Sequence, residues 1–290
     1  MHVPVLVEET LQNLNLKSGD NIIDATLDGG GHTKHFLEAV APNGKVLGIE
    51  QDPKMIESLK IKIQNKEFNF WNNLTIVHDN FKNIAKIAQK NNFSPDAIFF
   101  DLGMSTLHLT ESKRGFSFQK PEEILDMRFN PSPNKITAAE ILNSYSEKDI
   151  ARIFKDYGEE KLARVFAKKI FERRKKGRIL TVEDFLNATG LKNPKILARI
   201  FQSLRIFIND EINNLKLGIE GAFKILNHGG KMAVISYHSL EDREVKVFFL
   251  ANGKLNLQGK KFKKPIVPSD KEIQLNPSAR SAKLRILWKV

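Results

Sequence analysis

Short apolar runs alternate with amphipathic stretches through the first hundred residues. The runs at 21–25, 45–49, 74–77 and 97–100 have strand length and are rich in Ile, Leu, Val and Phe. The stretches at 33–40, 53–65 and 82–90 have helical spacing, and Pro53 suits the first turn of a helix. Because largely apolar strands separated by helices pair in parallel, this pattern predicts a doubly wound, Rossmann-like α/β sheet.

The pattern changes between residues 104 and 209. Apolar residues recur there at helical spacing, as at Ile150, Ile153, Phe154 and Tyr157, and we find no convincing strand. Strand-like runs return at 232–236 and 284–288. We therefore expect an all-helical domain, residues 105–209, inserted into a core formed by residues 1–104 and 210–290. Exposed loops tolerate such insertions, and the loop chosen follows a strand end, where open sheets bind ligands.

Composition narrows the class of protein. The 290 residues include no cysteine, which excludes disulfides, thiolate metal sites and a cysteine nucleophile. No apolar run approaches the ~20 residues that cross a bilayer, and the start of the chain does not resemble a signal peptide, so we expect a cytoplasmic protein without a membrane partner. The net charge of +12 and a pI near 9.6 favour a polyanionic partner such as nucleic acid, although a lysine-rich proteome would give the same surplus.

A glycine-rich stretch, DATLDGGGH at 24–32, directly follows the first expected strand. Glycines at this point allow a close approach of the backbone to a ligand, although a merely tight turn would also use them. A dinucleotide-binding loop would read G-x-G-x-x-G, whereas here His32 follows the third glycine and no glycine lies three residues further on. The spacing therefore argues against a nicotinamide cofactor and the corresponding oxidoreductase.

Acidic residues near this loop indicate a different cofactor. Glu50 ends the second strand about 20 residues after the loop, where an acid binds ribose hydroxyls. Asp24 and Asp28 would face a positive sulfonium, and Phe81, after Asp79 and Asn80, would contact an adenine. An acid such as Asp79 is equally suited to cap a helix. S-adenosylmethionine has ribose and adenine but no phosphate, so this set predicts S-adenosylmethionine.

The chemistry is expected around the end of the fourth strand. Asp101 is our first candidate, because an acid that ends an apolar strand points into the crevice, although it could also be a cap or a cofactor ligand. Ser105 nearby is a second hydrogen-bond acceptor, and His238 and Asp242 are further candidates that could equally be structural. Aromatic side chains could hold a flipped base or belong to the core: Phe116, Phe118 and Tyr237.

Eight stretches in register resemble the bacterial small-subunit ribosomal RNA cytosine-N4 methyltransferases of the MraW or RsmH type. They lie at 2–6, 24–32, 48–53, 101–105, 114–128, 201–211, 236–243 and 276–285, so the resemblance runs almost end to end. It implies a methyltransferase core with a helical insertion and methylation of a cytosine N4 amine in ribosomal RNA. It also implies cofactor contacts at Gly30, Gly31, His32, Glu50, Phe81, Asp101 and His108.

The sequence departs from the family pattern at three places. Glu50 stands where Asp is commoner, and a glutamate can still bind both ribose hydroxyls. The stretch 105–108 reads Ser-Thr-Leu-His where the family usually has Ser-Ser-Pro-Gln, so His108 would replace a glutamine donor. The closing segment 276–280 has one arginine fewer than usual, which puts part of an RNA contact in doubt.

Basic residues that could follow an RNA backbone occur in two places, one of them the segment 260–264. The other is a run that could equally be a solvated helix face: Lys168, Lys169, Arg173, Arg174, Lys175, Lys176 and Arg178. The predicted partner is ribosomal RNA within the small subunit, and the sequence leaves monomer and homodimer open. The alternatives are a methyltransferase for another RNA or DNA amine and a non-catalytic RNA-binding or assembly protein on the same fold.

Overall fold

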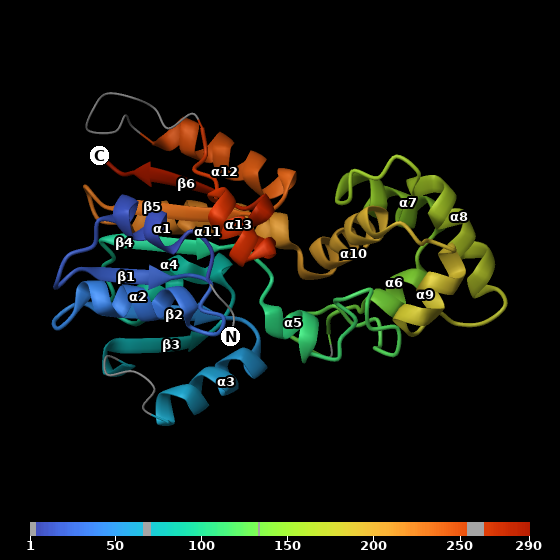
Figure 1. Cartoon of the computed structure of the whole chain (residues 1–290), viewed down its shortest axis with the longest axis horizontal. Coiled ribbons are helices and arrows are strands. Elements are labelled where there is room, and N and C mark those ends of the chain that lie inside the picture. Colours follow the sequence, from blue (N-terminus) through green and yellow to red (C-terminus); the bar gives the residue numbers. More distant parts are fainter. Residues whose placement is uncertain (1–3, 66–70, 133, 254–263) are drawn as a thin grey trace. The chain divides into compact units, whose positions relative to one another are not determined.

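The computed structural model describes residues 4–65, 71–132, 134–253 and 264–290. The chain divides into two compact units (Figure 1). One, here called the α/β unit, comprises Met1–Gly103 and Ile212–Val290. The other, the helical unit, is the continuous segment Met104–Glu211. The basic segment 260–264 lies outside the described residues except for Lys264.

The α/β unit contains a six-stranded sheet in the order β3-β2-β1-β4-β5-β6. Its first five strands are parallel, and β6 pairs antiparallel with β5. The strands are β1 (Asn21–Asp24), β2 (Lys45–Glu50), β3 (Leu74–His78), β4 (Ala97–Asp101), β5 (Lys231–Ser236) and β6 (Lys283–Trp288). The predicted doubly wound α/β sheet is confirmed, and each of the six expected strands is present.

Helices cover both faces of this sheet (Figure 1). Ile22 packs into a cluster with α1 (Val7–Leu14), α2 (Gly31–Val40) and α3 (Pro53–Gln64). Its neighbour Ile23 packs into the opposite cluster with α4 (Ile84–Lys90), α11 (Glu211–Ile225) and α12 (Ser239–Asn252). Successive residues of a strand point to opposite faces, so two apolar residues in a row are needed in a sheet covered on both sides. The shorter elements are η1 (Trp71–Asn73), η2 (Phe81–Asn83), α13 (Asp270–Leu275) and η3 (Pro277–Ser281).

The strand order places the ligand crevice. The chain leaves β1 toward β2 and β3 on one side and continues with β4 on the other, so the order reverses between β1 and β4. Ligands bind outside the carboxyl ends of strands at such a switch point. Asp24, Glu50 and Asp101 are the last residues of β1, β2 and β4. Three acids therefore lie at the carboxyl edge of neighbouring strands.

The helical unit has its own apolar core, which includes Ile153, Phe154, Phe185 and Phe201. Its helices are α5 (Thr106–Thr110), α6 (Ala138–Ser144), α7 (Glu147–Asp156), α8 (Ala163–Arg174), α9 (Val182–Thr189) and α10 (Pro194–Asn209). Capping boxes at Thr137 and Thr181 begin α6 and α9. Within the described part of this unit the only β-type pairing is the isolated bridge between Ile124 and Thr181.

None of the helices in the described ranges combines the length and the apolar character that a membrane span requires.

Candidate active site

The glycine-rich loop after β1 is hydrogen-bonded to both neighbouring strands. The Ala25 amide donates to the Phe99 carbonyl of β4 (2.8 Å), and the Leu27 amide donates to the Ile49 carbonyl of β2 (3.0 Å). Gly30 has φ = 78°, and a Cβ there would lie 2.9 Å from Leu59 Cδ1. A side chain at this position would therefore strain the backbone and clash with α3. The loop is held tightly, as a surface that a ligand approaches closely must be.

Asp24 is buried at the end of β1, with 1% of its surface exposed. The Thr33 hydroxyl donates to one carboxylate oxygen (2.5 Å) and the Thr26 amide to the other (3.2 Å). Burial nevertheless raises the pKa of Asp24 to about 7, and the nearby charge of Asp101 acts in the same direction. A cation placed beside this carboxyl would favour its charged form.

Glu50 is also buried, at the end of β2. Its two oxygens accept hydrogen bonds from the Asp52 amide (2.7 Å) and the Asp28 amide (2.9 Å), which fixes the carboxyl group. Burial raises its pKa to about 7 against these hydrogen bonds, and burial together with the charge of Glu50 raises the pKa of Asp28. Because an ionised carboxylate has about four acceptor positions, these hydrogen bonds leave acceptor capacity for a ligand hydroxyl.

Asp101, at the end of β4, is held from three sides. Its own amide donates to Thr26 Oγ1 (2.6 Å), and the Gly103 amide donates to Asp101 Oδ1 (3.0 Å). His32 Nδ1 lies 3.6 Å from the other oxygen, Oδ2, while His32 Nε2 lies 2.9 Å from the Val5 carbonyl. The structure therefore brings Asp101 and His32 together at the switch point.

Tyr237, which follows β5, is fixed against the same acid. Its hydroxyl hydrogen-bonds with Asp101, and burial, followed by the charge and the hydrogen bond of Asp101, raises the pKa of Tyr237 well above its usual range. The hydroxyl therefore stays protonated and donates. A Cβ on Gly103 would lie 2.8 Å from Tyr237 Cε2, so only glycine allows the ring to pack there. Tyr237 thus supports Asp101, a contact that the sequence did not predict.

Phe81 lies just after β3, half-buried against Phe100 with its ring edge-to-face (5.6 Å). A Cβ on Gly218 of α11 would lie 2.7 Å from Phe81 Cδ2, so this glycine makes room for the ring. The neighbouring polar residues are used locally, because the Asn80 side chain caps η2 and Asp79 accepts from the amide of Asn80. Of the three residues predicted around the adenine, Phe81 has the free aromatic surface.

His238 and Asp242 have structural contacts in the α/β unit. His238 is the N-cap of α12, where its Nδ1 accepts from the Glu241 amide (3.4 Å) and its Nε2 lies 2.9 Å from Glu241 Oε1. Asp242 pairs with Arg285 (2.7 Å). Burial pushes the pKa of Asp242 upward, but the hydrogen bond and charge of Arg285 outweigh it and hold that pKa below its usual range. These contacts match the structural interpretation, and a catalytic role for His238 stays a prediction.

Ser105 and His108 belong to the helical unit and are both buried. Ser105 is the N-cap of α5. The ring of His108 packs with those of Phe116 (5.3 Å) and Phe129 (4.9 Å). Phe116 and Phe118 are part of or packed against the core of this unit, which agrees with the core interpretation rather than with base binding.

Sequence reasoning missed four residues that hold the acids and rings in place: Thr26, Thr33, Gly103 and Gly218. A signal existed for Gly218, since a glycine within a helical pattern often marks a close approach. The threonines gave no signal, because a hydroxyl near a strand end has many ordinary uses. Their role follows from the sheet, which places residues of β1, α2 and β4 side by side.

Comparison with known proteins adds whole-chain similarity to this geometry. Ribosomal RNA small subunit methyltransferase H of Dictyoglomus thermophilum is 42% identical over 99% of this chain and 96% of its own. The protein of the same name from Carboxydothermus hydrogenoformans is 38% identical over 100% of this chain and 98% of its own. Among solved structures, an rRNA methylase from Streptococcus thermophilus covers 100% of this chain and 99% of its own, with 11% identity and a TM-score of 0.45. The sequence profile of the MraW methylase family matches residues 1–290, and the chain belongs to that family.

Proposed function

We propose that this protein transfers a methyl group from S-adenosylmethionine to the N4 amine of a cytosine in small-subunit ribosomal RNA. The observation that carries the proposal is the group of buried and half-buried carboxyls at the switch point, where Asp24, Asp28 and Glu50 have raised pKa values. Such a site favours a small ligand that carries positive charge and hydroxyl groups. Family membership and the names of the full-length relatives support the substrate.

The residues at the switch point fit S-adenosylmethionine. Glu50 would hold the ribose hydroxyls with the acceptor capacity that the backbone amides leave, and Phe81 would cover the adenine. Gly30, Gly31 and His32 form the turn into α2, which would lie against the amino-acid part of the cofactor, and Asp24 and Asp28 would offset the positive sulfur. When bound, S-adenosylmethionine supplies a methyl group on its positive sulfur. The sulfur keeps the electron pair of the broken carbon–sulfur bond and becomes a neutral thioether.

The protein's main task is then to align the amine with the methyl group. The cytosine N4 forms the new bond to carbon and must lose one proton. Asp101 would accept a hydrogen bond from this amine and then the proton, because its carboxylate is fixed by Gly103 and Tyr237 at the end of β4. Ser105, His108 and His238 stay predictions, the first two within the helical unit.

We propose that the two compact units act as the methyltransferase core and an inserted domain, with separate tasks. The α/β unit holds the cofactor site, and the helical unit supplies contacts to RNA. Because its proposed substrate is the small ribosomal subunit, the protein would act in the cytoplasm. This division rests on the acids in one unit and the basic run in the other.

The direct test uses labelled S-adenosylmethionine and small ribosomal subunits that lack the modification. We expect one label per subunit, on the N4 of a cytosine, after incubation with the protein and mapping of the RNA. Label on another base or atom would show that the proposed substrate is wrong. Binding of S-adenosylmethionine without transfer to RNA would favour a non-catalytic protein.

A further inference from the structure

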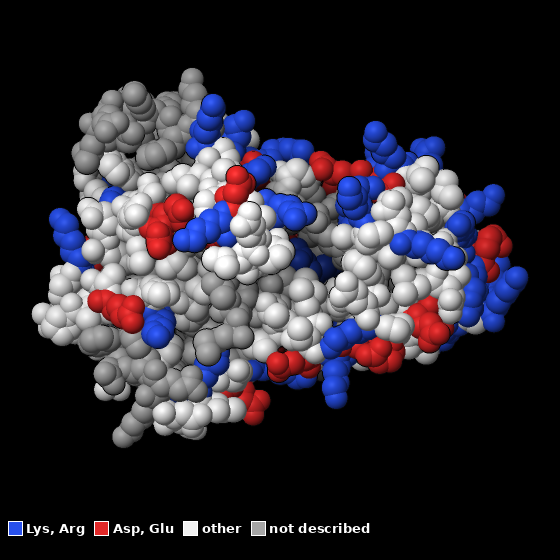
Figure 2. All heavy atoms as spheres, in the orientation of Figure 1, with Lys and Arg blue, Asp and Glu red and all other residues white. Residues whose placement is uncertain are grey.

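Positive charge is concentrated in one segment of the helical unit. Nine of the eighteen residues 161–178 are Lys or Arg, and Glu172 is the only acid among them. Most of this segment is α8 and the turn that follows it. Figure 2 shows many Lys and Arg side chains over this part of the helical unit.

Some of these cations form contacts within the protein. Arg174 donates to the carbonyls of Leu142 (3.1 Å) and Tyr145 (2.6 Å) and lies over the ring of Phe171 (4.5 Å). Lys175 pairs with Glu172 (2.8 Å), and this hydrogen bond lowers the pKa of Glu172. The one acid in the segment therefore already has a partner. Glu172 also attracts Lys168 and Lys176, but one acid offsets only part of the charge of the cations around it.

Four of the other cations line a surface groove between α8 and α9, together with Glu172, and this groove has a volume of about 550 Å³. Lys169 Nζ donates to the Thr189 carbonyl at the end of α9 (2.9 Å), and Arg173 donates to the Gly177 carbonyl (3.1 Å). Both carbonyls are neutral and orient the cations, although Arg173 also interacts with the charge of Asp184. In the described part of the chain, the side chains of Lys168 and Lys176 have no hydrogen bond and no ion pair within 4.0 Å.

We propose that this groove binds the phosphodiester backbone of the substrate RNA. The inference rests on the proposed function for the identity of the polyanion, and it assigns a place for it in the helical unit. Four cations line one groove, and phosphates attract Lys and Arg irrespective of base sequence. The residues that would contact phosphate are Lys168, Lys169, Arg173 and Lys176.

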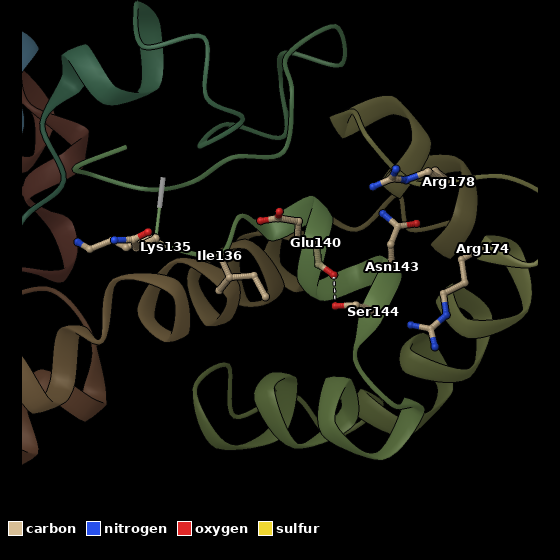
Figure 3. Close-up of a pocket in the computed structure, with 8 residues that line it drawn as sticks. Lys135, Ile136, Glu140, Asn143, Ser144, Arg174 and Arg178 are labelled. Carbon is tan, nitrogen blue, oxygen red and sulfur yellow. Dashed lines mark hydrogen bonds between the residues drawn. The ribbon is translucent and has the colours of Figure 1, made fainter. Parts of the chain in front are cut away.

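A second pocket of the helical unit serves as a contrast. It has a volume of about 590 Å³ and is lined by Glu140, Asn143, Ser144, Arg174 and Arg178, among others (Figure 3). Glu140 belongs to the capping box of α6, and Asn143 donates to the carbonyls of Ala139 and Ile179 (2.7 Å each). Its polar groups thus mainly hold α6 in place. The α8–α9 groove is the better anion site because it is lined by four cations and one acid, and that acid is already paired with Lys175.

The test is RNA binding by the double variant Lys168→Gln/Lys176→Gln of the full chain. The probe is a fluorescent single-stranded RNA of about 20 nucleotides, with an oligomer of the same bases on an uncharged methylphosphonate backbone for comparison. Each phosphate contact on a single strand contributes about −0.7 to the slope of log K against log salt. We expect the double variant to lose about 1.4 of that slope and to bind the RNA about 10- to 25-fold more weakly at 0.1 M salt.

The matched control is Lys148→Gln/Lys155→Gln, which removes the same charge from exposed positions on α7 that do not line the groove. We expect its Kd to stay within about twofold of the wild type, and the uncharged oligomer to bind all three proteins equally weakly. With unmodified small subunits, the groove variant should raise KM and leave kcat and S-adenosylmethionine affinity unchanged.

Equal losses of RNA affinity in the two double variants, or an unchanged Kd in the groove variant, would contradict the proposal that the groove binds RNA. A larger loss of binding to anionic phosphatidylglycerol vesicles than to RNA would also overturn it, because the ligand would then be a lipid surface. If binding of RNA depends on the groove but no methyl reaches cytosine N4, the proposed function fails and the groove stands.

Discussion

The two units of this protein handle charge in opposite ways. In the α/β unit the prominent ionisable groups are carboxyls buried at the ends of β1, β2 and β4, and burial raises the pKa of Asp24 and Glu50 to about 7. In the helical unit they are exposed cations around α8, of which Lys168 and Lys176 reach into solvent. The α/β unit therefore buries its prominent ionisable groups, whereas the helical unit exposes them to water.

The difference indicates what each unit binds. Buried carboxyls interact strongly with a small cation in a site of low polarity, and salt screens them little. Exposed cations interact weakly one by one, but several of them bind a polyanion by releasing its counterions. A methyltransferase for RNA needs both, because its cofactor carries a single positive sulfur and its substrate carries many phosphates.

The variant Asp101→Asn should have the largest effect, and it should affect catalysis in the α/β unit without affecting RNA binding. It keeps the shape of the side chain but removes the charge that accepts from Tyr237 and from the substrate amine, so we expect kcat/KM to fall about 1,000-fold. RNA affinity, measured by fluorescence anisotropy, should stay within about twofold of the wild type. The control is Asp156→Asn at the exposed end of α7, which should leave both quantities unchanged. A full rate in Asp101→Asn would remove this acid from the chemistry.

Ionic strength should act on one unit only. Raising the monovalent salt from 50 to 200 mM should weaken RNA binding about 50-fold if four phosphates are contacted, because the slope is then near −2.8. The affinity for S-adenosylmethionine, measured by calorimetry in the same buffers, should change less than about twofold. Equal sensitivity of the two ligands would show that the contrast between buried and exposed charge is wrong.

The variant Tyr237→Phe tests whether the site depends on the support of its acid. Loss of one hydrogen bond to a charged group should lower kcat about 10-fold, measured with unmodified small subunits at saturating S-adenosylmethionine. Asp101 is also faced by Asp24, Asp28 and His32, which stay in place in this variant. Tyr145→Phe, in the helical unit, is the matched control and should leave kcat unchanged.

The buried carboxyls should also make the stability of the cofactor-free protein depend on pH. A carboxyl with a raised pKa in the folded state favours its protonated form there, so it supports folding at low pH and this support is lost as pH rises through about 7. The cofactor-free protein should therefore unfold at lower temperature at pH 7.5 than at pH 5.5, as measured by calorimetry.

S-adenosylmethionine prefers the ionised carboxyls, so its affinity should rise about 5- to 10-fold between pH 6 and 7.5. S-adenosylhomocysteine, which lacks the positive sulfur, should respond less. The same rise for both ligands would mean that the acids do not sense the sulfonium.

The sequence by itself determined much of the frame. Strand-length apolar runs and helical spacing are local properties, so the six strands and the helical character of residues 104–209 could be predicted without knowledge of contacts. Asp24, Glu50 and Asp101 were candidates because each directly follows an apolar strand. The family resemblance, carried by short stretches along the whole chain, was confirmed by full-length relatives.

The tertiary structure decided how these residues act on one another. The bond of Tyr237 to Asp101 joins positions 136 residues apart, and Gly103 and Gly218 matter because of the rings that pack on them. It also showed which cations of α8 line a groove, which a count of lysines cannot do. The physical reason is that pKa values, hydrogen bonds and close packing depend on neighbours brought together by the sheet and the helices, whereas a sequence records only the order of residues.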